Sequence, residues 1–299
     1  MVGMMAQGDH LETSGAGGTV SRRGRVPLRE LALIAPAVLI ILAVLAYPMG
    51  VIAVRSFVEP TPGIGNYTWF FSSPVNRTVL LRTFSISAWV TLVCILCAYP
   101  YAFLMTAVGP KMRLLLVLGV LVPFWVSGVI RTLAWVILLQ DSGLINQFIK
   151  WLGFAPIRLI RTPLGVTIGM VQVLLPFMIM PLYAVLRGID LRLVTASQSL
   201  GATPLRSFLQ VYLPLSLPGV YAGGLIVFIL SLGFYITPAL LGGPSSTMLS
   251  SLVQQQVLIL LNWGRGGAMG VILLVMTLIL LAISALLTRR KYAISGGSK

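Results

Sequence analysis

The 299-residue chain is 58% hydrophobic and only 9% charged, with a mean hydropathy of +0.98. A soluble protein carries about a quarter charged residues, so this composition excludes a soluble globular chain and predicts an integral membrane protein. The net charge of +15 is scattered over the loops, which indicates membrane orientation and contact with anionic lipid rather than nucleic-acid binding.

Residues 1–29 form a polar, basic N-terminal tail that contains Arg22, Arg23, Arg25 and Arg29. A basic segment before an apolar run resembles a signal peptide. The run that follows is of full membrane-spanning length and lacks a small-residue cleavage signature, which predicts a retained first span.

Six apolar runs reach the length of about 20 residues that a helix needs to cross the hydrocarbon core. The longer runs favour helices over the short alternating segments of a membrane β-barrel. We therefore predict an all-α integral membrane fold, with a permease domain over 30–290 and a C-terminal tail over 291–299. The predicted spans are 31–54, 84–107, 114–139, 164–186, 219–241 and 267–288.

The distribution of Lys and Arg predicts the orientation of these spans. One side of the membrane receives both tails and the 108–113 and 187–218 loops, with Arg22, Arg23, Arg25, Arg29, Lys111, Arg113, Arg187, Arg192, Arg206, Arg289, Arg290, Lys291 and Lys299. The other side receives Arg55, Arg77, Arg82, Lys150, Arg158, Arg161 and Arg265. The positive-inside rule makes the first side, with both termini, cytoplasmic. Each outer loop has room for a short interfacial helix.

The spans lack the residues of most catalytic and metal chemistry. The single histidine, His10, lies in the N-terminal tail, and no predicted span contains Asp or Glu. Histidine triads, HExxH metal sites and carboxylate proton relays are therefore excluded from the membrane body. No nucleotide-binding motif occurs, so we expect no cofactor in this chain. Cys94 and Cys97 form a CxxC within an apolar run, where we expect two buried helix cysteines.

Arg131 is the one ionisable residue deep inside a predicted span. A charge at that depth indicates a functional role by default, and snorkelling or a bond to a broken-helix carbonyl is the alternative. Aromatic residues are plentiful in the same spans. Our candidate translocation path consists of Arg131, Trp125, Trp135, Phe234 and Tyr235.

The 187–218 loop is polar and patterned like two short helices. Asp190 is a good N-cap for a helix that runs to about Leu200, and Gly201 is placed to end it. Thr203 then caps a second helix with Pro204 at its first position. We expect Leu213-Pro214 to end that helix. The apolar residues are expected to rest on the membrane body: Leu191, Val194, Leu205, Phe208 and Leu209.

The spacing Thr195-Ala196-Ser197-x3-Gly201-x9-Val211-x-Leu213-Pro214 resembles the EAA loop of ABC importer permeases, EAA-x3-G-x9-I-x-L-P. Flanking segments such as "LPLSLPGVYAGGLIVFILSLGFYITPALLGG" are similar to the first permease subunit of spermidine/putrescine-type importers, and the resemblance covers about 31–290. It implies the six-span type I importer permease fold with a cytoplasmic coupling helix. The motif's leading glutamate is Thr195 here, and its second alanine is Ser197.

In this family the coupling helix inserts into a cleft of a cytoplasmic ATPase. The resemblance thus implies a non-catalytic subunit of a bacterial inner-membrane importer, working with a second permease, two ATPase copies that bind ATP and Mg, and a periplasmic solute-binding protein. It implies an ATPase-coupling segment made of Thr195, Ala196, Ser197, Gln198, Ser199, Gly201, Ala202, Leu213 and Pro214.

A polyamine such as spermidine or putrescine is the substrate that the resemblance favours. The scarcity of acids leaves room for an aminophosphonate, an opine or another small anionic or zwitterionic solute in the same architecture. A self-contained sodium-coupled carrier is the alternative of another class, and it predicts an inverted internal repeat that we do not find in the sequence. An assembly protein, whose role would not involve ATP-driven solute movement, is a third possibility.

Overall fold

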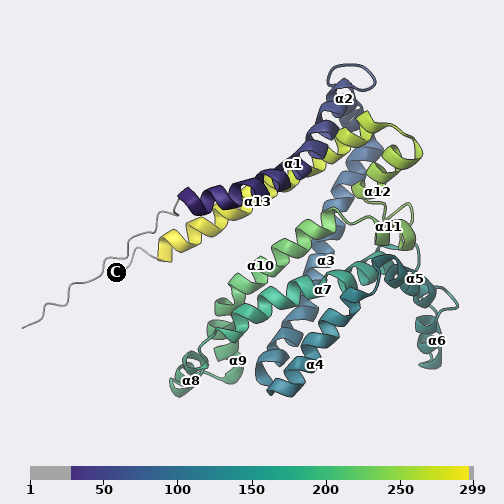
Figure 1. Ribbon diagram of the computed structural model, residues 1–299. Coiled ribbons are helices and arrows are strands. Elements are labelled where there is room, and N and C mark those ends of the chain that lie inside the picture. Colours follow the sequence, from purple (N-terminus) through teal and green to yellow (C-terminus); the bar gives the residue numbers. More distant parts are fainter. Residues whose placement is uncertain (1–27, 296–299) are drawn as a thin grey trace, which may run out of the picture. The chain divides into compact units, whose positions relative to one another are not determined.

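The computed structural model describes residues 28–295, with side chains from 36 to 286, and this part of the chain contains helices and no strand (Figure 1). The chain divides into two compact units, one ending at Met49 and one beginning at Gly50. The elements are α1 (Leu28–Val58), α2 (Gly65–Ser72), α3 (Pro74–Ala107), α4 (Pro110–Leu121), η1 (Val122–Trp125), α5 (Gly128–Leu139), α6 (Leu144–Trp151), α7 (Pro163–Arg187), α8 (Leu191–Ser199), α9 (Pro204–Ser207), η2 (Phe208–Tyr212), α10 (Leu213–Leu232), α11 (Ile236–Leu241), α12 (Leu249–Gln254), η3 (Gln255–Ile259) and α13 (Trp263–Ser295).

The first unit is the beginning of α1, whose described side chains from Pro36 to Met49 are all exposed. The predicted tail, 1–29, lies outside the described residues except for Leu28 and Arg29, which begin α1. At the other end α13 runs to Ser295, so the predicted C-terminal tail is helical over 291–295, and 296–299 lie outside the described residues.

Six segments among the described residues are long and apolar enough to cross a membrane, which confirms the predicted number of spans. They are Pro36–Val58, Pro74–Ala107, Gly128–Trp151, Pro163–Arg187, Pro204–Leu232 and Trp263–Leu286. The second begins about ten residues before its predicted start.

Three of the helices begin with the same capping motif, a Ser or Thr N-cap followed by proline. Ser73, Thr162 and Thr203 each accept a hydrogen bond from a backbone N–H three residues later, at 3.4, 3.2 and 3.3 Å. Proline then occupies the first helical position, where its missing N–H costs nothing. These caps fix the starts of α3, α7 and α9.

The prediction of a continuous third span over 114–139 is wrong. The structure has α4, the 3-10 turn η1 and α5 in its place, with extended backbone at Val126. Pro123 lies at the start of η1, and its missing N–H and its ring oppose continuation of the α-helix. The segment that now qualifies as a span is Gly128–Trp151, which joins α5 to α6.

The fifth span also differs from its prediction of 219–241. Its helix begins earlier, because α9, the π-helical turn η2 and α10 follow one another without a break, and Leu213-Pro214 does not end a helix. The π turn bonds the Leu213 N–H to the Phe208 carbonyl, and this wider turn accommodates Pro214, whose ring opposes a regular α turn. α10 then ends at Leu232, and α11 begins at Ile236.

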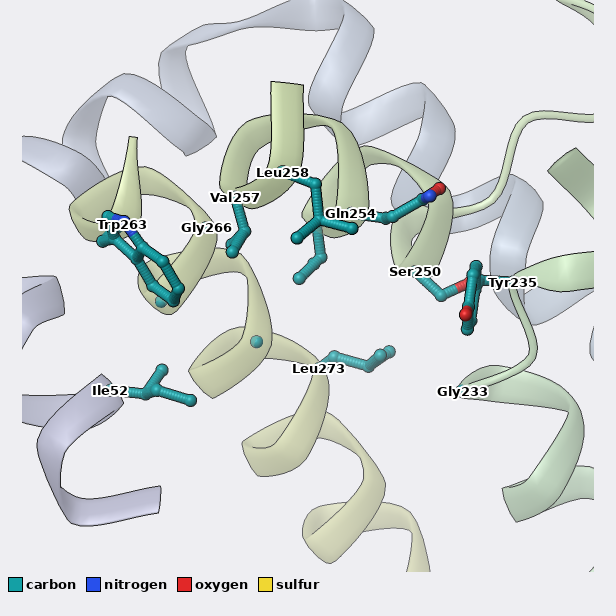
Figure 2. Close-up of a pocket in the computed structure, with 13 residues that line it drawn as sticks. Ile52, Gly233, Tyr235, Ser250, Gln254, Val257, Leu258, Trp263, Gly266 and Leu273 are labelled. Atoms are coloured by element: carbon teal, nitrogen blue, oxygen red, sulfur yellow. The ribbon is translucent and has the colours of Figure 1, made fainter. Parts of the chain in front are cut away.

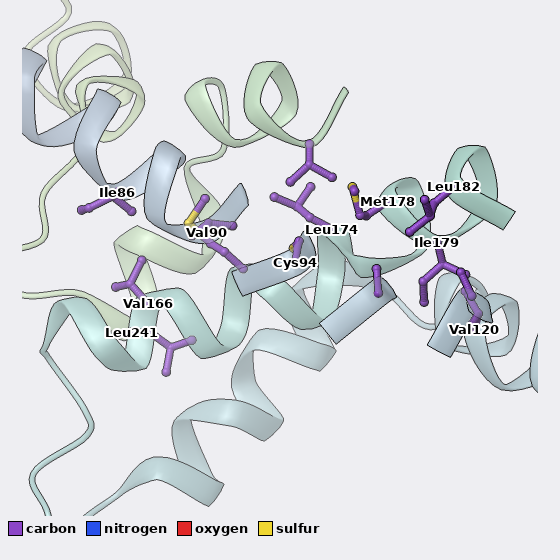
Figure 3. Packing of buried hydrophobic residues seen from close by; sticks show 14 of the residues in the cluster. Ile86, Val90, Cys94, Val120, Val166, Leu174, Met178, Ile179, Leu182 and Leu241 are labelled. Carbon is purple, nitrogen blue, oxygen red and sulfur yellow. The ribbon is translucent and has the colours of Figure 1, made fainter. Parts of the chain in front are cut away.

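The larger hydrophobic core lies among α3, α7 and α10, which run alongside one another in the second unit (Figures 1 and 3). Gly219 and Gly223 on α10 let that helix approach α7 closely. A Cβ atom at Gly219 would lie 2.9 Å from the Val185 Cβ, and one at Gly223 would lie 2.8 Å from the Met178 Sδ. Small residues at this spacing permit close packing of membrane helices.

A smaller core lies where α2, α12 and α13 meet the beginning of α3. Its buried members are Phe70, Val79, Leu80, Leu249, Met269 and Ile272. The cysteine prediction is half wrong: Cys94 is buried in the larger core, but Cys97 is exposed. Three residues advance a helix by about 300°, so Cys97 leaves the buried face that Cys94 occupies.

Candidate functional site

The first helix of the predicted coupling segment, α8, has the ends that its sequence predicts. The Asp190 carboxylate accepts a 2.9 Å hydrogen bond from the Arg192 N–H at its start. At its end Gly201 adopts a φ of +92°, and its N–H bonds to the Gln198 carbonyl at 2.9 Å. The Ala202 N–H bonds to the Ser197 carbonyl at 3.2 Å, which completes a Schellman motif.

The second helix, α9, is tied to α8 by a side-chain contact that the sequence did not reveal. A 2.7 Å hydrogen bond joins the hydroxyls of Ser197 and Ser207, and Ser207 is buried. Ser197 stands where the EAA pattern has its second alanine, so this departure from the pattern creates a bond between the two helices. Val194 and Phe208 pack against the larger core, as predicted.

The outward surface of α8 carries most of the residues that we assigned to ATPase coupling. Thr195, Ala196, Gln198, Ser199 and Gly201 are exposed, whereas Ser197 and Ala202 are partly buried. The hydroxyl of Thr195 donates a 3.3 Å hydrogen bond to the Leu191 carbonyl of its own helix. Leu213 and Pro214 lie apart from this surface, in the continuous helix that leads into α10.

The prediction that the leucines of this segment rest on the membrane body is wrong. Leu191 is 64% exposed, Leu205 68% and Leu209 50%, and Leu200 is also almost fully exposed at 90%. Val194 and Phe208 already fill the contact with the core, which leaves the leucines outside it. The segment therefore presents an apolar surface around the polar residues of α8.

The residues of the candidate translocation path are spread over the two interrupted spans, and the structure does not bring all of them together. Trp135 and Phe234 pack against the larger core, and Trp125 is 92% exposed. The guanidinium of Arg131 lies over the Phe124 ring, 5.8 Å from its centroid. Its Nε and Nη1 atoms are buried and form no hydrogen bond.

A hydrogen bond between α5 and α11 connects the two interruptions. The hydroxyls of Thr132 and Thr237 lie 3.3 Å apart, and both side chains are buried. Gly169 of α7 provides room for α11, because a Cβ atom there would lie 2.7 Å from the side chains of both Thr237 and Leu241. The helices that follow the two breaks are thus packed against each other and against α7.

A cavity of about 510 Å³ opens beside the second interruption (Figure 2). Tyr235 and Ser250 lie at one side of it and Trp263 at the other, with Leu273 below. Of our path residues, it contains only Tyr235. The guanidinium of Arg55 lies over the Trp263 ring at 5.4 Å and also forms an exposed ion pair with Glu59, with 3.7 Å between Nε and Oε1. Among the described residues, the acidic and thiol side chains form no group that could bind a metal.

Comparison with known proteins shows the family to which the chain belongs. The model described as "Binding-protein-dependent transport system inner membrane component" matches residues 112–291, which include both interrupted spans and the α8–α9 segment. The chain belongs to this family. It is a permease subunit of an ABC transporter, a multi-pass component of the inner membrane, as the resemblance predicted.

The relatives are similar over most of their length. The spermidine/putrescine transport system permease protein PotB of Haemophilus influenzae is 37% identical over 222 residues, or 74% of this chain and 77% of that protein. PotB of Escherichia coli is 36% identical over 229 residues, 76% and 83% of the two chains. The inner membrane ABC transporter permease protein YdcU of E. coli is 32% identical over 213 residues, 67% and 68%.

A solved structure confirms the fold. A chain of a bacterial ABC transporter involved in the import of the acidic polysaccharide alginate matches with a TM-score of 0.69, covering 88% of this chain and 96% of that one. The sequences are 20% identical. The predicted all-helical importer permease fold is therefore confirmed.

Proposed function

We propose that the chain is the permease subunit of an ATP-driven importer that moves a polyamine, such as spermidine or putrescine, from the periplasm to the cytoplasm. The observation that carries the substrate class is the 36–37% identity to spermidine/putrescine permeases over 74–76% of the chain. The relatives cover enough of their own length, 77% and 83%, that the match includes most of a permease rather than a shared fragment.

In this proposal both termini and the α8–α9 segment face the cytoplasm, as the distribution of Lys and Arg predicts. A second permease completes the membrane part, two copies of an ATPase bind ATP and Mg, and a periplasmic solute-binding protein delivers the solute. PotC, the permease of a spermidine/putrescine system in Shigella flexneri, is 32% identical over 123 residues. This second type of related permease supports a pairing of two different homologous chains.

The α8 surface is the contact with the ATPase. Thr195, Gln198 and Ser199 offer neutral hydrogen-bonding groups, and the exposed Leu200 and Leu205 flank them with apolar area. A short helix with such a surface suits docking into a groove of a partner protein. The hydrogen bonds of Thr195 are about half as strong as those of the glutamate in the EAA pattern, so shape and apolar contact contribute more to this docking.

ATP-driven movement of the bound ATPases then acts on the membrane helices through a continuous helical connection. α8 is bonded to α9 through Ser197 and Ser207, and α9, η2 and α10 are continuous, so a displacement of α8 is passed to the fifth span. That span is interrupted at its other end, at 233–235, where α11 is bonded to α5. Non-helical backbone inside a membrane is tolerated only when it is buried in protein or lines a cavity, and here it borders the 510 Å³ cavity.

Two features bear on the substrate in opposite ways. The aromatic rings of Tyr235 and Trp263 suit transient contact with an ammonium group. The unpaired guanidinium atoms of Arg131 favour an anionic solute, and this observation supports the second candidate, an aminophosphonate, an opine or another small anionic or zwitterionic solute. The identity to spermidine/putrescine permeases supports the polyamine.

Uptake by the reconstituted complex tests the proposal. The chain is purified from native membranes with its partners and placed in liposomes with the binding protein, ATP inside and labelled spermidine outside. We expect ATP-dependent uptake of spermidine that unlabelled putrescine reduces. Uptake of a labelled aminophosphonate or opine, without spermidine uptake, would support the second candidate, and uptake without ATP would support a sodium-coupled carrier.

A further inference from the structure

Four aromatic rings surround the junction between the coupling segment and the fifth span. Phe208 and Tyr212, from the π turn η2, are stacked with their centroids 5.7 Å apart. Tyr99 and Phe103, from α3, meet them edge-on: Tyr99 lies 6.0 Å from Phe208, and Phe103 lies 5.5 Å from Tyr212. We call these four residues the aromatic clasp.

A polar contact extends the aromatic clasp onto α10. The hydroxyls of Tyr99 and Ser216 lie 3.0 Å apart, and Ser216 is fully buried. Aromatic pairs of this geometry are more favourable than the burial of their area alone. Together with the hydrogen bond to Ser216, they attach α3 to the π turn and to the start of α10 at several points.

The aromatic clasp joins two places where a helix is locally irregular. On one side is the π turn, which is one of the irregularities at which helices kink. On the other side is Pro100, which lies inside α3 between Tyr99 and Phe103 and removes one hydrogen bond from the helix. Both helices therefore have an irregularity at the level of the rings where they can bend.

The end of α3 beyond Pro100 is in turn bonded to α4. The Tyr101 hydroxyl donates to the Leu116 carbonyl at 2.8 Å. Arg113 of α4 donates from Nε to the Met105 carbonyl and from Nη2 to the Val108 carbonyl, each at 3.0 Å. Motion that reaches the end of α3 is thereby passed to α4, which leads into the interruption at η1.

We propose that the aromatic clasp is the joint that passes the motion of the α8–α9 segment to α3 and α4 as well as to α10. Tyr99, Phe103, Phe208 and Tyr212 are positioning residues in this role, because they touch neither ATP nor the solute. The proposal rests on the proposed function, since it assumes that an ATPase drives α8. In this proposal the ATPase moves the first interrupted span as well as the second. It does so through aromatic residues that the EAA pattern does not specify.

The test measures spermidine imported per ATP hydrolysed by the reconstituted complex. Phe208→Leu removes the ring that contacts all three others, and Tyr99→Phe removes only the hydroxyl that bonds to Ser216. Phe148→Leu is the matched control, because Phe148 is stacked on Trp151 at 5.8 Å in α6, away from the coupling segment. We expect Phe208→Leu to lower the ratio about two- to thirtyfold, the range for a lost coupling contact, and Tyr99→Phe to lower it less.

A distance measurement separates this proposal from the proposed function. Spin labels at Leu104 and Gln210, both exposed, report on α3 and the π turn when Cys94 and Cys97 are replaced by alanine. In the otherwise unsubstituted complex we expect the same distance with and without an ATP analogue, and in Phe208→Leu a distance that changes when the analogue binds. A distance that changes already without Phe208→Leu, or a transport ratio unchanged in both variants, overturns the proposal.

The distance measurement does not depend on the identity of the solute, because the ATP analogue alone drives it. If the complex binds no ATPase at all, the proposed function fails instead. If Phe208→Leu does not assemble, Tyr99→Phe decides, since it keeps the ring and all of its packing.

Discussion

The hydroxyl of Ser250 donates a 2.7 Å hydrogen bond to the backbone carbonyl of Phe234. In a regular helix that carbonyl would accept from the residue four positions later, which is Pro238 and has no N–H. Ser250 therefore supplies the donor that the proline lacks, and it holds the interruption of the fifth span in place.

We expect Ser250→Ala to lower the stability of the purified chain by about 0.5–1.5 kcal/mol, because the partly buried Phe234 carbonyl then loses a hydrogen bond. Thermal unfolding in detergent measures the change. Ser85→Ala is the control: Ser85 is exposed and donates to the Leu81 carbonyl within α3, which keeps its helical donor. Equal shifts in the two variants would contradict this role of Ser250.

The spans themselves were predictable, but their interruptions were not. Pro36, Pro48, Pro100, Pro176 and Pro181 lie inside helices that continue past them. Pro123 instead lies at the first interruption, and Pro238 lies in the first turn of α11, just after the second. The difference at Pro238 depends on a donor from residue 250, a tertiary contact that hydropathy does not contain.

The coupling segment shows the same division between local and tertiary information. Asp190, Gly201 and Thr203 act within a few residues of themselves, so their roles as caps could be predicted. The exposure of Leu191 and Leu205 depends on which side chains of the segment pack against the core, and there the prediction was wrong. The continuation through Pro214 requires a π turn, which neither hydropathy nor the capping residues indicate.

Close packing of α7 and α10 at Gly223 makes a second prediction. In Gly223→Ala the new methyl group would lie 2.8 Å from the Met178 Sδ and 3.0 Å from its carbonyl oxygen, so the helices must separate. We expect a loss of about 1–3 kcal/mol, as for other overpacked cores, in the detergent unfolding assay. Gly50→Ala, with no atom within 4 Å of the new Cβ, should be neutral or slightly stabilising. A neutral Gly223→Ala would show that the contact can yield.

The bond between Ser197 and Ser207 makes a third prediction. Ser207→Ala removes the link between α8 and α9 but leaves Ser197 bonded to the Val194 carbonyl. We expect the affinity for the ATPase to fall about two- to tenfold, the effect of one lost hydrogen bond on the orientation of α8. Binding of the purified ATPase to the permease in nanodiscs measures it. Ser72→Ala, at an exposed serine of α2, is the comparison and should leave the affinity unchanged.

Arg131 distinguishes the two solute classes. Its buried Nε and Nη1 atoms form no hydrogen bond, so Arg131→Gln removes a charge without breaking one there. For a polyamine, we expect uptake at least equal to that of the unsubstituted complex, because the removed charge repels the solute. For an anionic solute, uptake should fall. Initial rates of spermidine uptake in liposomes decide, and a marked decrease would contradict the polyamine assignment.

Photo-crosslinking from Gln198, in the reconstituted complex, tests the central claim most directly. A photoreactive amino acid at this exposed position of α8 reaches only what covers the coupling surface. We predict a crosslink to the ATPase subunit that is lost when Gly201→Asp disrupts the turn after α8. Crosslinks only to lipid or to the second permease, in a complex that hydrolyses ATP, would contradict the claim that the ATPase drives transport through α8.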